Sequence, residues 1–520
     1  MRVYRFITES PASPLIVFGL AVLAAHVLRL GRFRIPWVGL AAVFTAARII
    51  AAATYVFLPI ALGDTETDVA CISALALRGL PVYPAPDAAS RYHMVYGPLT
   101  YLAHVPIYPV LGASLVSFKL LGFFACLLSI VALYRICRKY APPRICIVGI
   151  GAASLVLFRY LGIDFHGRSD PLILCVVAVC TLIVLDAPAW GVALAGAIAL
   201  GLIPNFKVSG FAYLLPIFGL IVIRNGWRMA SIAAALGALL LPLPFILPNV
   251  SLADYAFILK VNENHGLSAD LLLRNAQYSI IMLAPVLAVA FSRRNKPWPS
   301  RAQMSYLTLT VCGMGMSSVV GAKIGAGSYH LVPYIVPLLH LYFWMRNESV
   351  PPADADYAFK RFAIAWTVAM LVYSVTRVQV VLGEFEFAPS GRRVISEIRH
   401  VKRTYPGRTL EIGIGRDFYD RRTRYSYVTT FDGQPYTLSG SAIRDLQFGG
   451  VGIPDATVRY IEDCQTQIWL IPKRQSPFTA TNPYYSSYHP AFDERFRRAF
   501  LAHYNKIDSG ELFDVWSCVN

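Results

Sequence analysis

Long apolar runs separated by short polar segments dominate the first three quarters of the chain. A helix that crosses a bilayer needs about 20 mainly apolar residues. The runs therefore predict twelve membrane-spanning helices, at residues 12–28, 37–62, 113–136, 145–163, 171–187, 189–206, 208–223, 229–248, 279–292, 302–320, 329–346 and 362–382. The apolar stretch 96–112 is interrupted by three prolines, so we expect it to be interfacial or re-entrant.

Lys and Arg are concentrated in alternate loops between these spans. Basic loops of a multispan protein face the cytoplasm. The segments 63–95, 164–170, 249–278 and 321–328 and the C-terminal tail are then expected outside the cytoplasm. The basic residues that set this orientation are Arg29, Arg32, Arg34, Arg138, Lys139, Arg144, Arg224, Arg228, Arg293, Arg294, Lys296, Arg301, Arg346, Lys360 and Arg361.

The tail, residues 384–520, has a different pattern of short elements. Segments 409–415, 425–431 and 467–472 are predicted as strands, and segments 392–404 and 491–504 as helices. Strands alternating with helices favour a small α/β domain. The sequence therefore predicts a polytopic α-helical membrane protein of about twelve spans (residues 1–383) with a small C-terminal extracytoplasmic α/β domain (384–520).

Composition supports this class. The chain of 520 residues is 56% hydrophobic and 15% charged, whereas soluble domains carry about a quarter charged residues. Of the net charge of +17, the tail contributes 18 Lys and Arg against 16 Asp and Glu. The excess positive charge thus belongs to the membrane loops and does not indicate a nucleic-acid partner.

Two cysteines in the tail, Cys464 and Cys518, form a disulfide if the tail is extracytoplasmic. The alternative, two free thiols, stays open from the sequence. No Gly-rich phosphate loop, nucleotide fingerprint or Cys/His zinc spacing occurs along the chain. This argues against a cytosolic nucleotide-sugar site and against an ATP-driven pump.

Three acids, Asp64, Glu66 and Asp68, follow the second predicted span in the stretch GDTETD. One interpretation is a capping box of Thr65 and Asp68 for a helix over 66–78 that Gly79 ends. The other is chemical: Asp64 and Asp68, four residues apart, share a helix face. Desolvated carboxylates there have raised pKa values and act as bases, or hold a divalent cation such as Mg²⁺ or Mn²⁺.

The order of motifs resembles the GT-C glycosyltransferases, multispan enzymes that take sugars from polyprenyl-phosphate carriers. Segment 63–84, with its acids, Gly79 and Tyr83, followed by YGPLTYL (96–102), is similar to the first external loop of that family. HGRSDPLIL (166–174) resembles its second external loop, and 204–216 and 327–339 resemble its donor regions. The chain departs from the family in an additional N-terminal span and in lacking a plain Asp-x-Asp.

The resemblance implies an inner-membrane enzyme that moves a sugar from a polyprenyl-phosphate carrier to an acceptor hydroxyl of a glycan, a lipid or a protein on the outer face. It implies that Asp64 and Asp68 supply the base and a possible metal contact. Cations are needed where charge develops on the leaving phosphate. The residues assigned to donor and substrate binding are Tyr96, Arg168, Asp170, Lys207, His265 and His330; Lys323 is interpreted as a loop charge.

Two other functions remain as alternatives. A multispan transporter or lipid or glycan flippase places ionisable residues near the bilayer midplane, often in repeated halves. The acids here cluster at one face, no repeat is visible, and a sizeable tail follows, which favours the enzyme. An assembly protein whose tail recruits partners would not need the acids.

Overall fold

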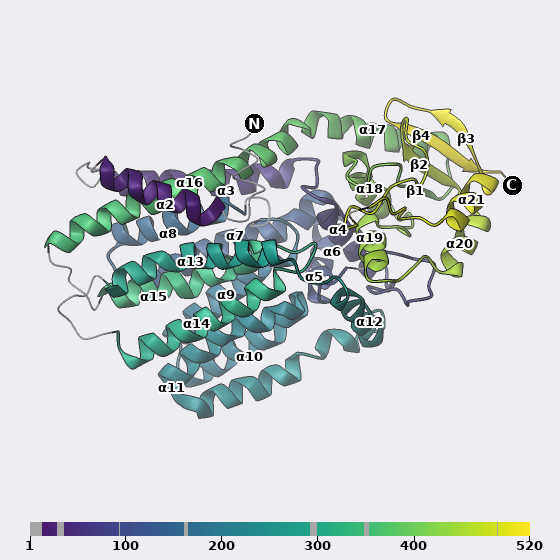
Figure 1. Cartoon of the computed structure of the whole chain (residues 1–520). Helices are drawn as coiled ribbons and strands as arrows, with labels where there is room; N and C mark the ends of the chain where they lie inside the picture. Colours follow the sequence, from purple (N-terminus) through teal and green to yellow (C-terminus); the bar gives the residue numbers. More distant parts are fainter. Residues whose placement is uncertain are drawn as a thin grey trace. The chain divides into compact units, whose positions relative to one another are not determined.

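The computed structural model describes residues 13–28, 36–92, 94–160, 165–291, 299–347, 353–485 and 487–519 (Figure 1). Six of the basic loop residues used for orientation lie outside these ranges: Arg29, Arg32, Arg34, Arg293, Arg294 and Lys296. The chain forms two compact units. Unit 1 comprises Met1–Tyr55, Gly122–Pro242 and Leu267–Leu382, and unit 2 comprises Val56–Leu121, Leu243–Gly266 and Gly383–Asn520.

Unit 1 is helical, and each predicted span overlaps a helical segment of the described chain. Residues 12, 161–163 and 292 of the predicted spans lie outside the described residues. The spans 208–223 and 229–248 fall in one element, α11, in which Gly226 adopts a non-helical φ of 79° that produces a kink. The elements are α2 (Ser13–Val27), α3 (Trp37–Phe57), α7 (Leu115–Arg138), α8 (Pro143–Phe158), α9 (Ser169–Asp186), α10 (Ala189–Phe206), α11 (Phe211–Leu240), α13 (Ala269–Phe291), α14 (Arg301–Val320), α15 (Ile335–Asn347) and α16 (Ala353–Glu386).

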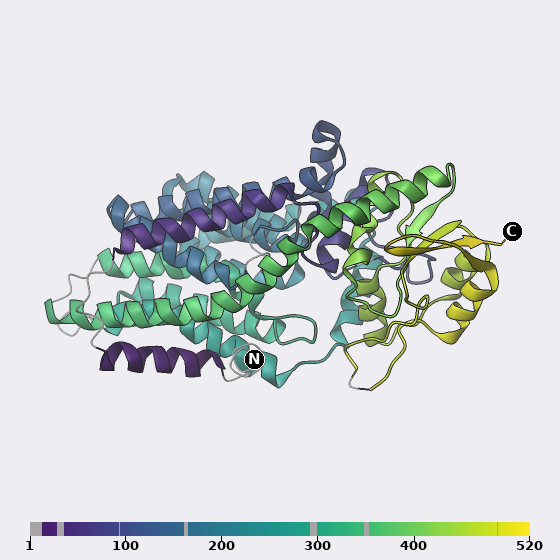
Figure 2. The ribbon, with the colours of Figure 1, turned by 90° about the horizontal axis from the view of Figure 1, so that it is seen from above.

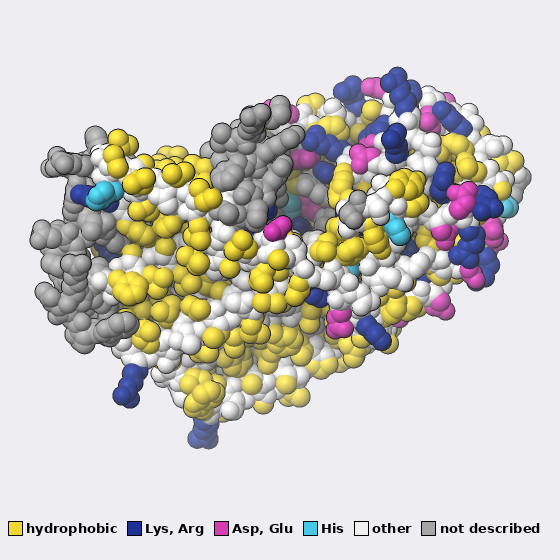
Figure 3. All heavy atoms as spheres, viewed as in Figure 1, with side chains coloured by type: hydrophobic (Ala, Val, Ile, Leu, Met, Phe, Trp, Pro, Cys, Tyr) yellow, Lys and Arg dark blue, Asp and Glu magenta, His cyan; other side chains and the backbone are white. Residues whose placement is uncertain are grey.

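Six of the described helical stretches are long and apolar enough to cross a membrane, and shorter apolar helices accompany them. Hydrophobic side chains cover much of the face of these helices that Figure 3 shows. A surface of this kind is stable in lipid and not in water. The chain is therefore a multipass membrane protein.

Small residues let neighbouring helices of unit 1 approach closely. Helices α2 and α16 lie side by side in Figures 1 and 2 and pack through Ala21, Ala25, Ala365 and Ala369. Between α8 and α3, a Cβ on Gly151 would lie 2.3 Å from the Cβ of Ala41. Contacts between small residues are the usual way in which helices associate in a bilayer, where burial from water gives no driving force.

Unit 2 combines the tail with two earlier segments of chain. One buried cluster contains Val69, Tyr101, Tyr255, Ile398 and Leu470, and so joins the region after α3, the region before α13 and the tail. The helices are α4 (Asp64–Leu77), α5 (Leu99–Leu102), η2 (Val105–Ile107), α6 (Tyr108–Leu111), α12 (Leu252–Glu263), α17 (Ala388–Thr404), η6 (Arg421–Tyr425), α18 (Ser426–Phe431), α19 (Gly440–Phe448), α20 (Asp455–Glu462) and α21 (Glu494–His503).

The tail carries a four-stranded sheet in the order β1-β2-β4-β3. Strands β1 (Leu410–Ile412) and β2 (Ile468–Pro472) pair in parallel, and β4 (Phe513–Cys518) pairs antiparallel with both β2 and β3 (Tyr504–Ser509). The two predicted strands at 409–415 and 467–472 and the helices at 392–404 and 491–504 are confirmed. Strands β3 and β4 were not predicted.

The prediction of a strand at 425–431 is wrong, because these residues form helix α18. The hydroxyls of Thr429 and Thr430 both donate to the carbonyl oxygen of Ser426, at 2.8 and 2.9 Å. Buried Tyr427 and Val428 belong to the same cluster as α4. Burial against a neighbouring helix thus outweighs the strand preference of the β-branched residues.

Helix α4 begins earlier than predicted and without the predicted capping box. Its N-cap is Gly63, which has no side-chain cap, and the first turn carries Asp64 and Glu66. The Glu66 carboxylate instead accepts a hydrogen bond of 2.9 Å from the Leu62 backbone N–H. Gly79, with φ of 75°, follows the last turn as predicted, in a backbone conformation that glycine adopts without strain.

Cys464 and Cys518 form a disulfide that links the segment directly after α20 to β4, at a sequence separation of 54. Closing a loop of this length removes about 4 kcal/mol of unfolded-state entropy by the chain-entropy relation. We expect the double variant Cys464→Ser/Cys518→Ser to lower the unfolding free energy of unit 2 by on the order of that amount. Thermal unfolding with and without reductant measures it; equal unfolding midpoints in both conditions would contradict the linkage.

Candidate functional site

The first candidate site lies in unit 2 at the start of α4. The Asp64 carboxylate accepts a hydrogen bond of 3.0 Å from Nε of Arg424, at the end of η6. The same guanidinium donates through Nη1 to Glu384, at 3.1 Å. One arginine thus fixes two carboxylates, and the Asp64 side chain remains 22% exposed.

Asp68 lies one turn further along α4 and is buried, with 3% of its surface exposed. Its Oδ1 accepts hydrogen bonds from the hydroxyl of Tyr436 and, at 2.9 Å, from the hydroxyl of Ser439 at the N-cap of α19. Its Oδ2 is buried and has no hydrogen-bond partner among the described residues. A buried carboxylate oxygen without a donor disfavours the ionised form.

The environment raises the pKa of both carboxyls. Burial raises the pKa of Asp64 above 3.8, against the opposing charge and hydrogen bond of Arg424. Burial raises the pKa of Asp68 to about 7, and the neighbouring charge of Asp64 adds to this, while the hydrogen bonds from Tyr436 and Ser439 oppose it. Raised carboxyl pKa values are typical of groups that take up a proton during catalysis.

The donor set around these acids does not fit a divalent cation. Asp64 is paired with a guanidinium and Asp68 with two hydroxyl donors, whereas Mg²⁺ and Mn²⁺ need several converging oxygen ligands. Over the described part of the chain, no group of three or more His, Cys, Asp or Glu side chains is arranged to hold a metal ion. Asp64 and Asp68 therefore do not form a metal site with the described residues around them.

The second candidate site lies in unit 1, where the ends of three elements meet. Asp170 is in the first turn of α9, Lys207 directly follows α10, and Tyr329 is in η5 (Ser328–Tyr334). The Asp170 carboxylate lies 3.5 Å from Nζ of Lys207. Its other oxygen lies 3.6 Å from Nε of Arg168. Two cations thus flank one carboxylate at this position.

We call the group formed by Arg168, Asp170, Lys207 and Tyr329 the cation cluster. Within it, the Tyr329 ring lies against both cations. The ring centroid lies 4.5 Å from Nζ of Lys207 and 5.5 Å from Cζ of Arg168. The ring stacks on His330, at 4.8 Å between centroids. A carboxylate and an aromatic face therefore hold both cations in place.

The structure places the predicted donor-binding residues in two groups. Arg168, Asp170, Lys207 and His330 are brought together in unit 1; the His330 ring is buried and its backbone carbonyl accepts a hydrogen bond of 3.0 Å from Tyr213. His265 lies in unit 2, where its Nε2 is 2.9 Å from the carbonyl oxygen of Asp445.

Tyr96 also lies in unit 2. It is buried, and its carbonyl oxygen accepts a hydrogen bond of 2.7 Å from Tyr83. Of the eight predicted site residues, Asp64, Asp68, His265 and Tyr96 therefore belong to unit 2.

Sequence reasoning missed several residues of both sites. Arg424, Glu384, Tyr436 and Ser439 all come from the tail or its junction and lie more than 300 residues from α4 along the chain. Arg424 occurs in the basic run 421–424, which has the composition of a solvated loop. Tyr329 lies directly before a predicted site residue, His330, but one tyrosine among 29 gives no signal by itself.

No protein-family model matches the chain, and no curated protein matches it. Solved structures do match. ArnT from Cupriavidus metallidurans bound to undecaprenyl phosphate is 13% identical and has a TM-score of 0.58, covering 92% of this chain and 98% of ArnT. ArnT in the apo state gives 13% identity, the same coverage and a TM-score of 0.53.

A third structure, arabinosyltransferase EmbB from Mycobacterium smegmatis, is 11% identical with a TM-score of 0.43 and covers 89% of this chain and 48% of EmbB. The similarity to ArnT extends over nearly the whole of both chains. The chain therefore has the GT-C fold that the order of its motifs predicts.

Proposed function

We propose that the protein is a glycosyltransferase that moves a sugar from a polyprenyl-phosphate carrier to an acceptor hydroxyl on the outer face of the membrane. The observation that carries the proposal is a partly exposed carboxylate with a raised pKa, Asp64, at the start of the helix that follows α3. The fold similarity to a protein bound to undecaprenyl phosphate supports the carrier class.

Asp64 is the general base of this proposal. An acceptor hydroxyl has to come within hydrogen-bond distance of the base, and the Asp64 side chain is exposed whereas Asp68 is buried. Arg424 holds the carboxylate in one orientation. Asp68 has a structural role in this proposal. It accepts hydrogen bonds from Tyr436 and Ser439 and so fixes α19 against α4.

The step balances without a further reactant. The acceptor oxygen attacks the anomeric carbon as its proton passes to Asp64, and the bond between that carbon and the phosphate oxygen breaks. The electron pair leaves with the polyprenyl phosphate, so no acid is required at the leaving group. In this account Lys207 and Arg168 stabilise the developing phosphate charge; arginine suits bidentate contact and lysine acts as a point charge.

The orientation of the chain is part of the proposal. The basic loops face the cytoplasm by the positive-inside rule, so α4 and the tail lie outside in this account. The Cys464–Cys518 disulfide supports this orientation, because such bonds persist in oxidising compartments. The proposed localisation is the inner membrane, with the tail extracytoplasmic.

The donor part of the proposal predicts a binding defect for Lys207→Gln. Loss of one charge-assisted contact, worth about 1.5–3 kcal/mol, should raise the KM for the polyprenyl-phosphate sugar by roughly tenfold to a hundredfold. Initial rates of sugar incorporation, measured in membranes at increasing concentrations of the lipid-linked sugar, give the KM. Lys323→Gln is the matched control and should leave the KM unchanged.

The same pair of variants separates two explanations. If Lys207→Gln and Lys323→Gln behave alike, the cation cluster does not hold the carrier phosphate. If Lys207→Gln lowers the amount of folded protein without changing the KM, Lys207 has only a structural role. Its assignment to binding of the carrier phosphate is then wrong.

A further inference from the structure

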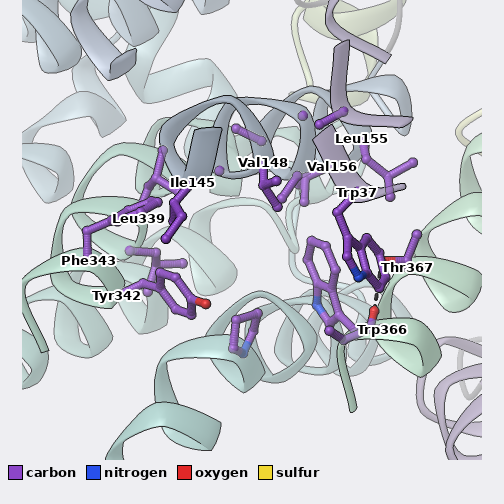
Figure 4. A pocket seen from close by; sticks show the side chains of 18 of the residues that line it. Trp37, Ile145, Val148, Leu155, Val156, Leu339, Tyr342, Phe343, Trp366 and Thr367 are labelled. Atoms are coloured by element: carbon purple, nitrogen blue, oxygen red, sulfur yellow. Dashed lines mark hydrogen bonds between the residues drawn. The ribbon is translucent and has the colours of Figure 1, made fainter. Parts of the chain in front are cut away.

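A cavity of about 350 Å³ lies within unit 1, away from the cation cluster, and the proposed function makes no use of it. Its walls come from five helices: α3, α8, α13, α15 and α16. Figure 4 shows Val148, Leu155, Val156 and Leu339 facing the cavity, with Trp37 and Trp366 at one side. The lining is apolar over most of its length, which suits a hydrocarbon chain.

Two cations line one end of this cavity. Arg346 is in the last turn of α15 and Lys360 is in the early part of α16. Both residues are exposed, so this end of the cavity reaches the surface. Two polar groups of the wall have partners within it: Nε1 of Trp366 donates a hydrogen bond of 3.0 Å to the carbonyl oxygen of Ile281, and the hydroxyl of Thr367 donates one of 2.8 Å to the carbonyl oxygen of Ala363.

The length of the cavity matches one leaflet of a bilayer. The lining residues of α8 extend from Ile145 to Val156, and a helix rises 1.5 Å per residue, so the cavity is about 16 Å long. The hydrocarbon core of a bilayer is about 30 Å thick. A chain that enters at Arg346 therefore ends near the midplane.

The cationic end of the cavity lies at the opposite end of α8 from the cation cluster. Ile145, next to that end, is in the first turn of α8, whereas Arg168 belongs to the segment that follows α8 and leads into α9. A lipid whose phosphate is bound at Lys207 and Arg168 cannot also place its phosphate at Arg346 and Lys360. A lipid with its phosphate at Arg346 and Lys360 would therefore be a second lipid.

We propose that this cavity is a binding site for an anionic phospholipid of the bilayer. One acyl chain lies along α8, and the phosphate contacts Arg346 and Lys360. Basic pockets between membrane helices bind anionic headgroups in this way. The charge of the two side chains selects an anionic headgroup, because a zwitterionic one brings its own cation to the same position.

Native mass spectrometry of the full chain in detergent, with equal amounts of phosphatidylglycerol and phosphatidylcholine added, tests the site. We expect one phosphatidylglycerol retained per chain, with at least a roughly tenfold preference over phosphatidylcholine. R346Q/K360Q should lose this preference. R361Q is the matched control: Arg361 is adjacent on α16, contacts Nδ1 of His26 at 3.2 Å, and does not line the cavity.

A second variant, Ala152→Phe, narrows the cavity without changing charge and should abolish retention of the lipid. Equal retention of both lipids by the wild-type chain would overturn the proposal, as would an unchanged preference in R346Q/K360Q. If added undecaprenyl phosphate displaces phosphatidylglycerol from this site with the same dependence on Arg346 and Lys360, the occupant is the carrier and the proposal of a bilayer phospholipid is wrong.

Discussion

We expect the replacement of Asp64 with asparagine to reduce the rate of sugar transfer by roughly 10²–10⁴-fold, the contribution that a positioned general base makes. Asparagine has the same shape and its carbonyl oxygen still accepts from Arg424, but it cannot take the proton of the acceptor hydroxyl. Glu384 still pairs with the guanidinium, so the fold should be retained. The measurement is sugar incorporation by membranes that contain equal amounts of wild-type or variant protein.

Asp87→Asn is the matched control for this experiment. Asp87 is an exposed acid in the segment that follows α4. The proposed sugar transfer does not involve this residue, so the Asp87→Asn variant should keep the wild-type rate. The pH dependence gives a second test. Because the base has to be ionised, the wild-type rate should rise with pH through the raised pKa of Asp64. A full rate for Asp64→Asn would exclude this residue as the base.

The second large expected effect is a pH dependence of the folding stability that arises from the titration of Asp68. Its pKa is about 7 in the folded chain and 3.8 for an ordinary aspartate. Between these pH values the folded state binds more protons than the unfolded state, so the stability falls as the pH rises. This difference between the two pKa values is equivalent to a stabilisation of about 4 kcal/mol. The stabilisation is lost progressively between about pH 4 and pH 7.

The variant Asp68→Asn removes this titration, so its thermal unfolding midpoint should change less with pH than that of the wild type over this window. At low pH, where Asp68 is protonated, the two proteins should have similar unfolding midpoints. The remaining difference is the cost of burying one amide donor at the position of Oδ2, which has no partner among the described residues. If the wild type and the variant show parallel pH profiles, Asp68 does not titrate as the burial indicates.

Much of the fold follows from the sequence because helices in a membrane carry their own signal. An apolar run of about 20 residues that forms a helix satisfies its backbone hydrogen bonds within the helix, whichever segments lie beside it. The tail lacks such a signal. Strand β3, YNKIDS, has a mainly polar sequence, and it forms because it pairs with β4 in a hairpin. Residues 425–431 have the composition of a strand but are buried against α4 as a helix.

The candidate sites were predictable in part, for a similar reason. The spacing of Asp64 and Asp68 places both on one helix face, which is a local property of the chain. Their partners Arg424, Tyr436 and Ser439 come from the tail, and no local pattern connects segments so distant in sequence. The grouping of Asp170 with Lys207 likewise depends on how α9 and α10 pack, which the sequence does not specify.

The central claim is that this chain adds a sugar to an envelope acceptor, and the mass of the envelope glycans tests it most directly. Glycans from cells that lack the protein should be lighter by one sugar residue. Wild-type protein should restore the mass, and the Asp64→Asn protein, present at the same level, should not. Identical glycan masses in all three strains would contradict the account.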